Sequence, residues 1–168
     1  GFCTLVACLA LIVFLVQGYQ RESDQHQRAD LSQLLSQVSA NFSLALSGPL
    51  ASVEVLASAV QADPKFATEN FEALATSVAG KLPEIISLQL APDGVVRYLT
   101  DLERNRAVIG HDLFADPQRN RAALLARKSR KIVSEGPISL LQGGSGLIIR
   151  RPIFLAAVTA SDDNFWGF

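Results

Sequence analysis

The residues that could do chemistry are few, and they lie far apart in the sequence. The two histidines, His26 and His111, have no partner at the spacing of a metal site. His111 stands beside Asp112, but adjacent strand residues point to opposite faces and do not form a dyad. The Gly-rich run 142–146 lacks the Lys of a phosphate loop and is typical of a hairpin turn. We therefore predict neither an enzyme nor a metal or cofactor site in this chain.

Composition sets further limits on function. The chain has 168 residues, enough for one domain of ordinary size, and its net charge of −1 gives no electrostatic case for nucleic-acid binding. Its two cysteines, Cys3 and Cys8, both lie in the apolar N-terminal run. A disulfide framework or a cysteine-rich metal site is thus excluded from the rest of the chain.

A binding surface is the remaining possibility for specific chemistry. Four polar residues could point into a small pocket formed by strands and a covering helix: Tyr98, Asp112, Ser134 and Arg150. Structural alternatives exist for three of them. Tyr98 suits a strand surface, Asp112 suits a cap of the turn that follows it, and Arg150 could pair with a surface carboxylate. The basic residues between 119 and 131 favour a solvated helix face over an anion or lipid-headgroup site.

The N-terminal segment predicts a membrane anchor. Residues Phe2 to Val16 contain no charged side chain. A spanning helix needs about 20 apolar residues, and because the sequence begins at Gly1 without a Met, we interpret residues 1–19 as a truncated transmembrane helix. A signal peptide and a buried core helix are the alternatives.

Residues 20–62 predict a long helix that acts as a stalk. Apolar residues recur at alternating spacings of four and three: Leu31, Leu35, Val38, Phe42 and Ala45. This stripe favours a stalk that packs on the domain and pairs in part with a second copy, and an ordinary amphipathic core helix is the alternative. Gly48-Pro49 interrupts the stripe and should kink the helix or shift its register.

Residues 63–168 predict an α+β domain with an antiparallel sheet and helices on one side. We expect a helix over 68–81 capped by Thr68, a hairpin of strands 85–90 and 95–99, and a loop over 100–106. A helix capped by Asp116 should begin at Pro117. Strands are expected over 132–134, 138–141 and 147–154, and the run 165–168 looks like the start of another strand that a C-terminal truncation cuts short.

This combination of short motifs resembles a CHASE domain. The resemblance covers roughly Val55 to the end of the chain, and it rests on Pro83, Ala91–Val96, Asn105, Ile109–Leu113, the helix from Pro117, Gly136-Pro137, Leu141–Gly144, Arg151–Phe154 and Phe165–Phe168. The combination is specific, although each motif alone is weak.

The resemblance implies a PAS-like sensory fold held between two transmembrane helices. It also implies a cytoplasmic output module outside this chain, typically a histidine kinase, a diguanylate cyclase or a cyclic-di-GMP phosphodiesterase. Plant members bind cytokinins, but the segment between Leu99 and Val108 is short here and leaves room for one compact unit. Cytokinin recognition is therefore not carried over.

The sequence thus predicts the extracytoplasmic ligand-sensing domain of a transmembrane signalling receptor. We expect an anchor in the inner membrane, residues from about 20 onward in the periplasm or outside the cell, a small-molecule ligand and a homodimer. The alternative is a dimerisation or protein-interaction module that binds no small molecule. A cavity lined by Tyr98, Asp112 and Ser134 would favour sensing, and a face filled by Leu and Ile would favour the alternative.

Overall fold

The computed structural model describes residues 2–80, 82–117, 120–156 and 164–168, and it describes side chains from residue 30 onward. The chain divides into two compact units, residues 1–46 and residues 47–168. The described residues of the first unit, 2–46, are all helical. Every strand among the described residues belongs to the second unit.

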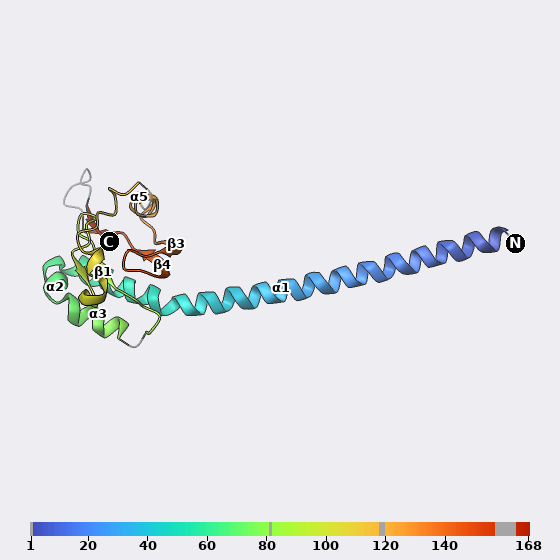
Figure 1. Cartoon of the computed structure of the whole chain (residues 1–168), viewed down its shortest axis with the longest axis horizontal. Helices are drawn as coiled ribbons and strands as arrows, with labels where there is room; N and C mark the ends of the chain where they lie inside the picture. Colours follow the sequence, from blue (N-terminus) through green and yellow to red (C-terminus); the bar gives the residue numbers. More distant parts are fainter. Residues whose placement is uncertain (1, 81, 118–119, 157–163) are drawn as a thin grey trace. The chain divides into compact units, whose positions relative to one another are not determined.

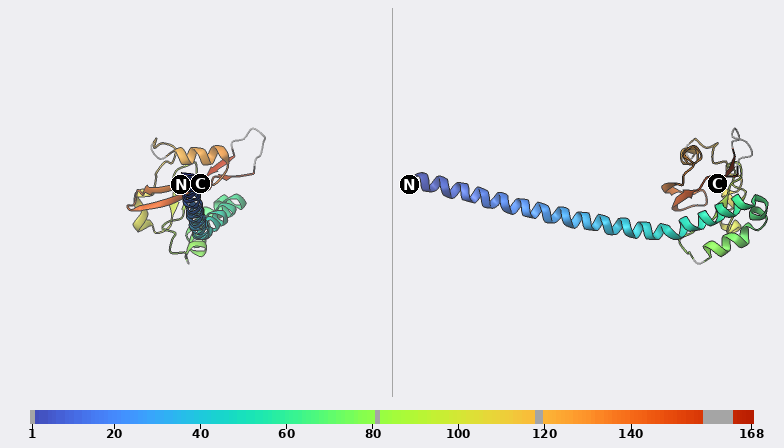
Figure 2. Two further views of the ribbon diagram at one scale, coloured as in Figure 1. Left: turned by 90° about the vertical axis from the view of Figure 1, so that its right-hand side faces the viewer. Right: turned by 180° about the vertical axis from the view of Figure 1, so that it is seen from behind.

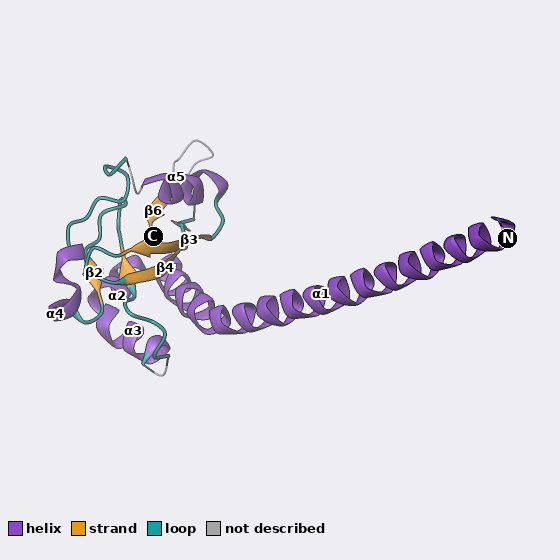
Figure 3. Cartoon of the chain, turned by 45° about the vertical axis from the view of Figure 1, so that its right-hand side comes forward, coloured by secondary structure: helices purple, strands orange, loops and turns teal. Residues whose placement is uncertain are grey.

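Groups of helices are followed by groups of short strands along the chain (Figure 1). In chain order they are α1 (Phe2–Ala62), α2 (Pro64–Glu69), α3 (Phe71–Ala79), β1 (Gln89–Leu90), β2 (Tyr98–Leu99), α4 (Leu102–Asn105), the 3-10 helix η1 (Arg106–Val108), α5 (Asn120–Ser129), β3 (Val133–Ser139), β4 (Ser145–Arg150), β5 (Ile153–Phe154) and β6 (Phe165–Gly167). Figure 3 shows how much of the domain consists of loops between these strands.

The strands form antiparallel pairs that backbone hydrogen bonds connect further. The pairs are β1 with β2, β3 with β4 and β5 with β6. The segment after β1 joins β6, because Ala91 N–H donates to Phe168 O at 2.8 Å and Asp93 N–H donates to Trp166 O at 2.9 Å. The expected pairing of 85–90 with 95–99 is confirmed by the register Leu90↔Tyr98, although the strands themselves are shorter, Gln89–Leu90 and Tyr98–Leu99. These bonds connect the β1–β2 and β5–β6 pairs into one antiparallel layer, whereas β3 and β4 form a separate hairpin.

Two hydrophobic clusters lie against this layer. The first joins the last part of α1 with α2, α3 and the strands, and its buried members are Leu56, Ala57, Val60, Ala67, Phe71, Ala75, Leu88, Leu90 and Ile153. The second joins α5 with the strands, and its buried members are Ala91, Val96, Val108, Ala123, Ala126 and Phe168. Figure 1 and both views of Figure 2 show strands between α5 and α3. The predicted α+β class is confirmed. Helices α1–α3 cover the strands on one side, and α5 covers them on the other.

The boundary between α1 and α2 follows from two adjacent residues. Asp63 caps α2, since its Oδ1 accepts a hydrogen bond from Phe66 N–H at 3.0 Å, and Pro64 occupies the start of the helix. A proline in the first helical turn loses no intrahelical hydrogen bond. The predicted break at Asp63-Pro64 is confirmed. A helix lies within the predicted range 68–81, but its predicted start at Thr68 is wrong: α3 begins at Phe71, and the Thr68 hydroxyl bonds back to Pro64 O inside α2.

Two further predictions of secondary structure need correction. Residues 100–106 are not a loop, because Asp101 accepts a hydrogen bond from Arg104 N–H at 3.3 Å and so caps α4. The strand expected to break at Gly136-Pro137 instead continues as β3, with a register shift between Glu135 and Ile138. Such a bulge accommodates a proline that cannot donate to the ladder. Asn120 is the first described residue of α5, and residues 118–119 lie outside the described part.

Helix α1 remains helical through the predicted interruption at Gly48-Pro49. The buried Ser52 hydroxyl lies 3.1 Å from Gly48 O and 3.2 Å from Val78 O, and so links this turn of α1 to α3. A Cβ at residue 48 would meet Leu82 Cδ2 at 3.1 Å, so Gly48 allows that side chain to pack closely. Whether the turn acts as a hinge stays a prediction.

The membrane prediction is tested only in part. Among the described side chains, residues 30–62 are long and apolar enough to cross a membrane, judged by length and composition alone. Part of that stretch is a core helix, because Leu56, Ala57 and Val60 are buried in the first cluster. Residues 2–29 are helical, but their side chains lie outside the described part. The span over residues 1–19 therefore stays a prediction.

Candidate functional site

A buried arginine stands at the end of the β3–β4 hairpin. Arg150 is the last residue of β4 and is only 6% exposed. Its Nη1 donates to Glu135 Oε2 at 2.9 Å, while the Glu135 side chain retains 28% of its exposure. The register places Val133 opposite Arg150 and Ile148 opposite Glu135. The ion pair therefore joins diagonal neighbours on one face of the hairpin.

The pairing of this arginine is incomplete. Arg150 Nε is buried and has no hydrogen-bond partner among the described residues. Leaving a buried donor unpaired costs about 1–3 kcal/mol, and more for a charged group. A guanidinium presents five N–H donors in a fixed fork. The Arg150 side chain thus has a donor beyond those that Glu135 satisfies.

The face that carries Arg150 belongs to the α5 side of the domain. Val133, which shares this face, packs against the second cluster with Ala123 and Ala126 of α5. Both alanines are fully buried, and their small side chains let α5 approach the strands closely. Arg150 is thus on the hairpin face that α5 covers.

An aromatic group with two arginines extends the same cluster. Phe165 lies 5.3 Å from Phe168 and 6.0 Å from Phe114, measured between ring centroids. Arg127 Cζ lies 4.7 Å from the Phe165 centroid, and Arg130 Cζ lies 4.1 Å from that of Phe154. Arg127 of α5, and Arg130 directly after the helix, place positive charge on aromatic faces, where cation–π attraction holds them. These two basic residues are thus not merely part of a solvated face.

The other residues predicted for the pocket have different surroundings. Tyr98 packs on the first cluster, with its ring 6.0 Å from that of Phe71. Asp112 Oδ1 accepts hydrogen bonds from Phe114 N–H at 2.8 Å and Ala115 N–H at 3.3 Å, so it caps a turn. Ser134 is exposed and lies on the opposite face of β3 from Glu135.

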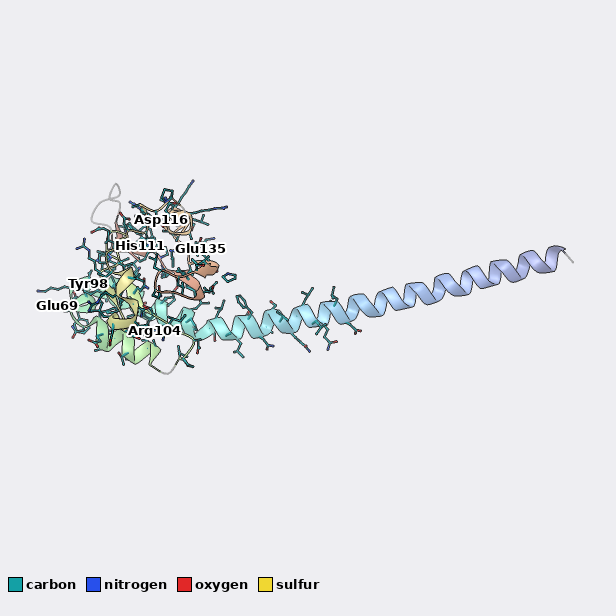
Figure 4. All side chains as sticks on the ribbon, in the orientation of Figure 1. Glu69, Tyr98, Arg104, His111, Asp116 and Glu135 are labelled. Carbon is teal, nitrogen blue, oxygen red and sulfur yellow. The ribbon has the colours of Figure 1, made fainter. Side chains whose placement is uncertain are left out.

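The described contacts do not bring these four residues into one site. In Figure 4, Tyr98 and Glu135, which belong to β2 and β3, lie apart from each other. The structural alternatives considered for Tyr98 and Asp112 match their observed contacts, and Arg150 pairs with a carboxylate as its alternative proposed. A ligand-binding role for Tyr98, Asp112, Ser134 and Arg150 stays a prediction. Among the described residues, no group of three or more His, Cys, Asp or Glu side chains could hold a metal ion.

Comparison with known proteins identifies the family. The model of the CHASE domain matches residues 47–168. The chain belongs to the CHASE domain family. This membership makes the chain an extracellular sensory domain and confirms the resemblance drawn from the motifs. The matched range coincides with the second compact unit, which begins at Ser47.

A solved structure supports the fold of this CHASE domain. An extracellular ligand binding receptor from Desulfohalobium retbaense DSM5692 matches it with a TM-score of 0.61 and 16% identity, over 80% of this chain and 23% of that one. At that identity the likeness concerns the fold alone. The chain spans about a quarter of the length of that receptor, 23%. No curated protein matches the sequence.

Two side-chain contacts fasten the hairpin end of the CHASE domain to α1. Arg151 Nε donates to Glu54 Oε1 at 3.0 Å, and Gln61 Nε2 donates to Phe154 O at 3.1 Å. Glu54 and Gln61 flank the buried residues of α1, and Arg151 directly follows Arg150. The buried Arg150 is therefore the immediate neighbour in sequence of a residue that contacts α1.

Sequence reasoning missed two residues of this region. Glu135 was not singled out, although it lies two residues along β3 from Val133, the residue opposite Arg150. A carboxylate at that position is a signal for a diagonal ion pair. Asn105 entered only through the family resemblance. It is completely buried, and its Nδ2 donates to Thr100 O and Asp101 O at 3.0 and 3.1 Å. Its Oδ1 has no partner among the described residues. Asn105 therefore holds the turn before α4 together.

Proposed function

We propose that this CHASE domain binds a small ligand outside the membrane and regulates a cytoplasmic output module that lies beyond this chain. The observation that carries the proposal is the shared core of α1 and the strands. Val60 of α1 and Ile153 of β5 are both almost fully buried in the first cluster. Because close-packed cores do not deform continuously, movement of the strands changes the packing of α1.

The ligand binds on the α5 side of the strands. Three features favour this side: the small alanines of α5, the aromatic group, and the unpaired N–H of Arg150. Apolar surface with a small number of polar groups is typical of small-molecule sites. The proposal assigns Arg150 to the ligand and leaves Tyr98 and Asp112 to their packing and capping roles.

The signal passes from the hairpin to α1. Ligand contact with Arg150 alters the end of β4, and Arg151 transmits the change to Glu54. The Gln61 bond to Phe154 O lies on the same route. A ligand shifts a conformational equilibrium only through its different affinity for the two states. The ligand must therefore favour one arrangement of β4, β5 and α1 over another.

The first unit connects this domain to the membrane and to a second copy. Leu31, Leu35, Val38 and Phe42 are between 58% and 65% exposed, although their spacing follows a heptad. A second α1 in a homodimer covers this stripe, and residues 1–19 anchor the chain in the inner membrane. The domain then stands in the periplasm.

A thermal-shift screen tests the ligand-sensing part of the proposal. The whole chain, held in detergent, is heated with a library of amino acids, carboxylates, purines and sugars. A ligand at 100 times its dissociation constant adds about 2.7 kcal/mol to the free energy of unfolding, which raises the melting temperature by several degrees. A reproducible shift supports a small-molecule sensor. A blank throughout favours the alternative, a dimerisation module that binds no small molecule.

Cysteine labelling tests the location. The native cysteines are Cys3 and Cys8 in the proposed span, so a Lys128→Cys variant supplies a single outer thiol on an exposed position. Intact cells are treated with a membrane-impermeant maleimide. Labelling of the variant but not of the unsubstituted chain places α5 outside the inner membrane. Labelling of neither before lysis, and of the variant after it, contradicts the periplasmic location.

A further inference from the structure

We infer that the ligand carries a carboxylate and that this carboxylate takes the place of Glu135 on Arg150. The inference rests on the proposed ligand-sensing function and names the chemical class of the ligand. The remaining part of the ligand is apolar and lies against the aromatic group and the alanines of α5.

The first argument is the way in which Glu135 holds the arginine. The described contact uses Nη1 alone, at 2.9 Å, and Nε remains buried without a partner. A carboxylate that approaches a guanidinium squarely makes parallel hydrogen bonds to two N–H groups. Glu135 reaches Arg150 from a diagonal strand position and makes one. A free carboxylate can adopt the two-bond geometry that Glu135 does not make in this structure.

The second argument is that Glu135 can leave. Its side chain is 28% exposed, so water can solvate the carboxylate once the pair separates. Glu135 also stands next to the bulge of β3, where regular pairing with β4 stops. A Cβ at Gly136 would meet Gly146 O at 2.8 Å, so only glycine lets the chain bend at this point. Bulges commonly redirect a neighbouring side chain.

The third argument is the charge and polarity of the surroundings. Arg150 is buried, so a partner carboxylate is required to balance its charge, whether it comes from Glu135 or from a ligand. The buried members of the second cluster on this side are all apolar: alanines, Val96, Val108 and Phe168. Arg127 and Arg130 add further positive charge beside the phenylalanines. A monocarboxylate with an apolar body fits this combination.

Matched ligand pairs test the inference. The whole chain in detergent is titrated calorimetrically with aromatic and aliphatic monocarboxylates, phenylacetate and octanoate among them, and with their primary amides. We expect a carboxylate to bind at least about tenfold more tightly than its amide, a difference of about 1.4 kcal/mol. Equal affinity for the two members of every pair overturns the inference.

Two variants separate this role from a purely structural ion pair. Arg150→Gln should abolish carboxylate binding, and circular dichroism checks that it is folded. Glu135→Gln removes the competing carboxylate and should raise the affinity for the bound carboxylate by about tenfold or more. If Glu135→Gln weakens binding, or Arg150→Gln leaves it unchanged, Glu135 does not occupy the ligand's place.

A nuclear magnetic resonance signal reports directly on the unpaired donor. The Nε–H resonance of Arg150, assigned through the Arg150→Gln variant, should shift on addition of the carboxylate and not on addition of the amide. An unchanged resonance in the presence of a bound carboxylate overturns the inference. If amides, sugars or cations bind while carboxylates do not, ligand sensing stands and only the ligand class is wrong. If no compound of any class binds, both proposals fail.

Discussion

The two sides of the strand layer are built from different kinds of side chain. On the side of α1, α2 and α3, the buried members of the cluster include three leucines and Ile153 beside alanines and Phe71. On the side of α5, the buried members are three alanines, two valines and Phe168, with no leucine or isoleucine among them. The two sides treat buried polar groups differently as well. Ser52, buried on the α1 side, lies within hydrogen-bond distance of two carbonyl oxygens, whereas Arg150 retains an unpaired Nε.

This difference suggests that the α1 side stabilises the fold and that the α5 side binds the ligand. A cluster of interlocking aliphatic side chains keeps α1 in a fixed place, since such packing tolerates little displacement. A face with small residues, aromatic rings and an unpaired donor is poor at stabilising the fold but suited to a ligand. Four changes test this distinction between the two sides, from the largest expected effect on stability to the smallest.

The largest effect is expected from truncation on the α1 side. Ile153→Ala, at a residue 2% exposed, should lower the free energy of unfolding by about 2–5 kcal/mol, the usual range for a buried aliphatic truncation. Chemical denaturation measures this value. The control is Leu124→Ala on α5, where the side chain is 47% exposed and the change should stay within about 0.5 kcal/mol. Similar losses from both variants would remove the distinction between core and surface on which the comparison depends.

The second effect concerns the ion pair on the α5 side. Glu135→Ala leaves Arg150 buried without its carboxylate and should cost about 1–3 kcal/mol, less than for a fully buried pair because Glu135 is partly exposed. Arg150→Met keeps the volume and removes the buried charge, so its effect on the free energy of unfolding should be smaller. Urea titration of both variants gives the order. A larger loss from Arg150→Met would mean that the pair mainly stabilises the fold.

The sequence predicted the parts of this fold that local patterns determine. The hairpin of β1 and β2 followed from the Pro92-Asp93-Gly94 turn, and Gly94 indeed has a positive φ of 85°. The turn of the β3–β4 hairpin followed from its glycines. Helix α4 was missed because a helix of four residues is too short to show a hydrophobic period. Its start depends on the cap by Asp101, whose backbone has a φ of 49°.

The site was harder to predict than the fold, for a physical reason. Polarity and strand position were the grounds for choosing Tyr98, Asp112 and Ser134. The surroundings of each side chain, however, depend on which cluster or turn its backbone joins in the folded chain. Arg150 was chosen on the same grounds, and only the register with β3 shows that Glu135 is its partner. Cross-strand pairs of this kind depend on register, which a bulge at Gly136 shifts by an amount that composition does not encode.

A smaller effect is expected from the paired polar group on the α1 side. Ser52→Ala removes the hydroxyl between Gly48 O and Val78 O and should cost about 0.5–1.5 kcal/mol. Ser36→Ala is the control, because that hydroxyl bonds only to Ser32 O within α1 and the residue is exposed. Thermal unfolding followed by circular dichroism compares the two. If Ser36→Ala costs as much as Ser52→Ala, the hydrogen bond from Ser52 to α3 contributes nothing to the free energy of unfolding.

The smallest effect comes from the contact between the hairpin and α1. A double-mutant cycle with Glu54→Gln and Arg151→Gln measures the coupling energy of a pair whose side chains are 48% and 23% exposed. Exposed pairs contribute about 0.2–1 kcal/mol, and salt weakens them. The pair Lys65–Glu69, at 3.8 Å and with 83% and 62% exposure, is the matched control and should give the lower value.

A weak contact is what a transmitting contact requires. Strong coupling between Glu54 and Arg151 would hold one arrangement of β4 and α1 too firmly for a ligand to change it, because a ligand contributes only its differential affinity. The coupling energy should therefore change when the carboxylate ligand binds to Arg150. Repeating the cycle with saturating ligand measures that change. An identical coupling energy with and without ligand would show that the signal reaches α1 through the packed aliphatic core instead of through Arg151.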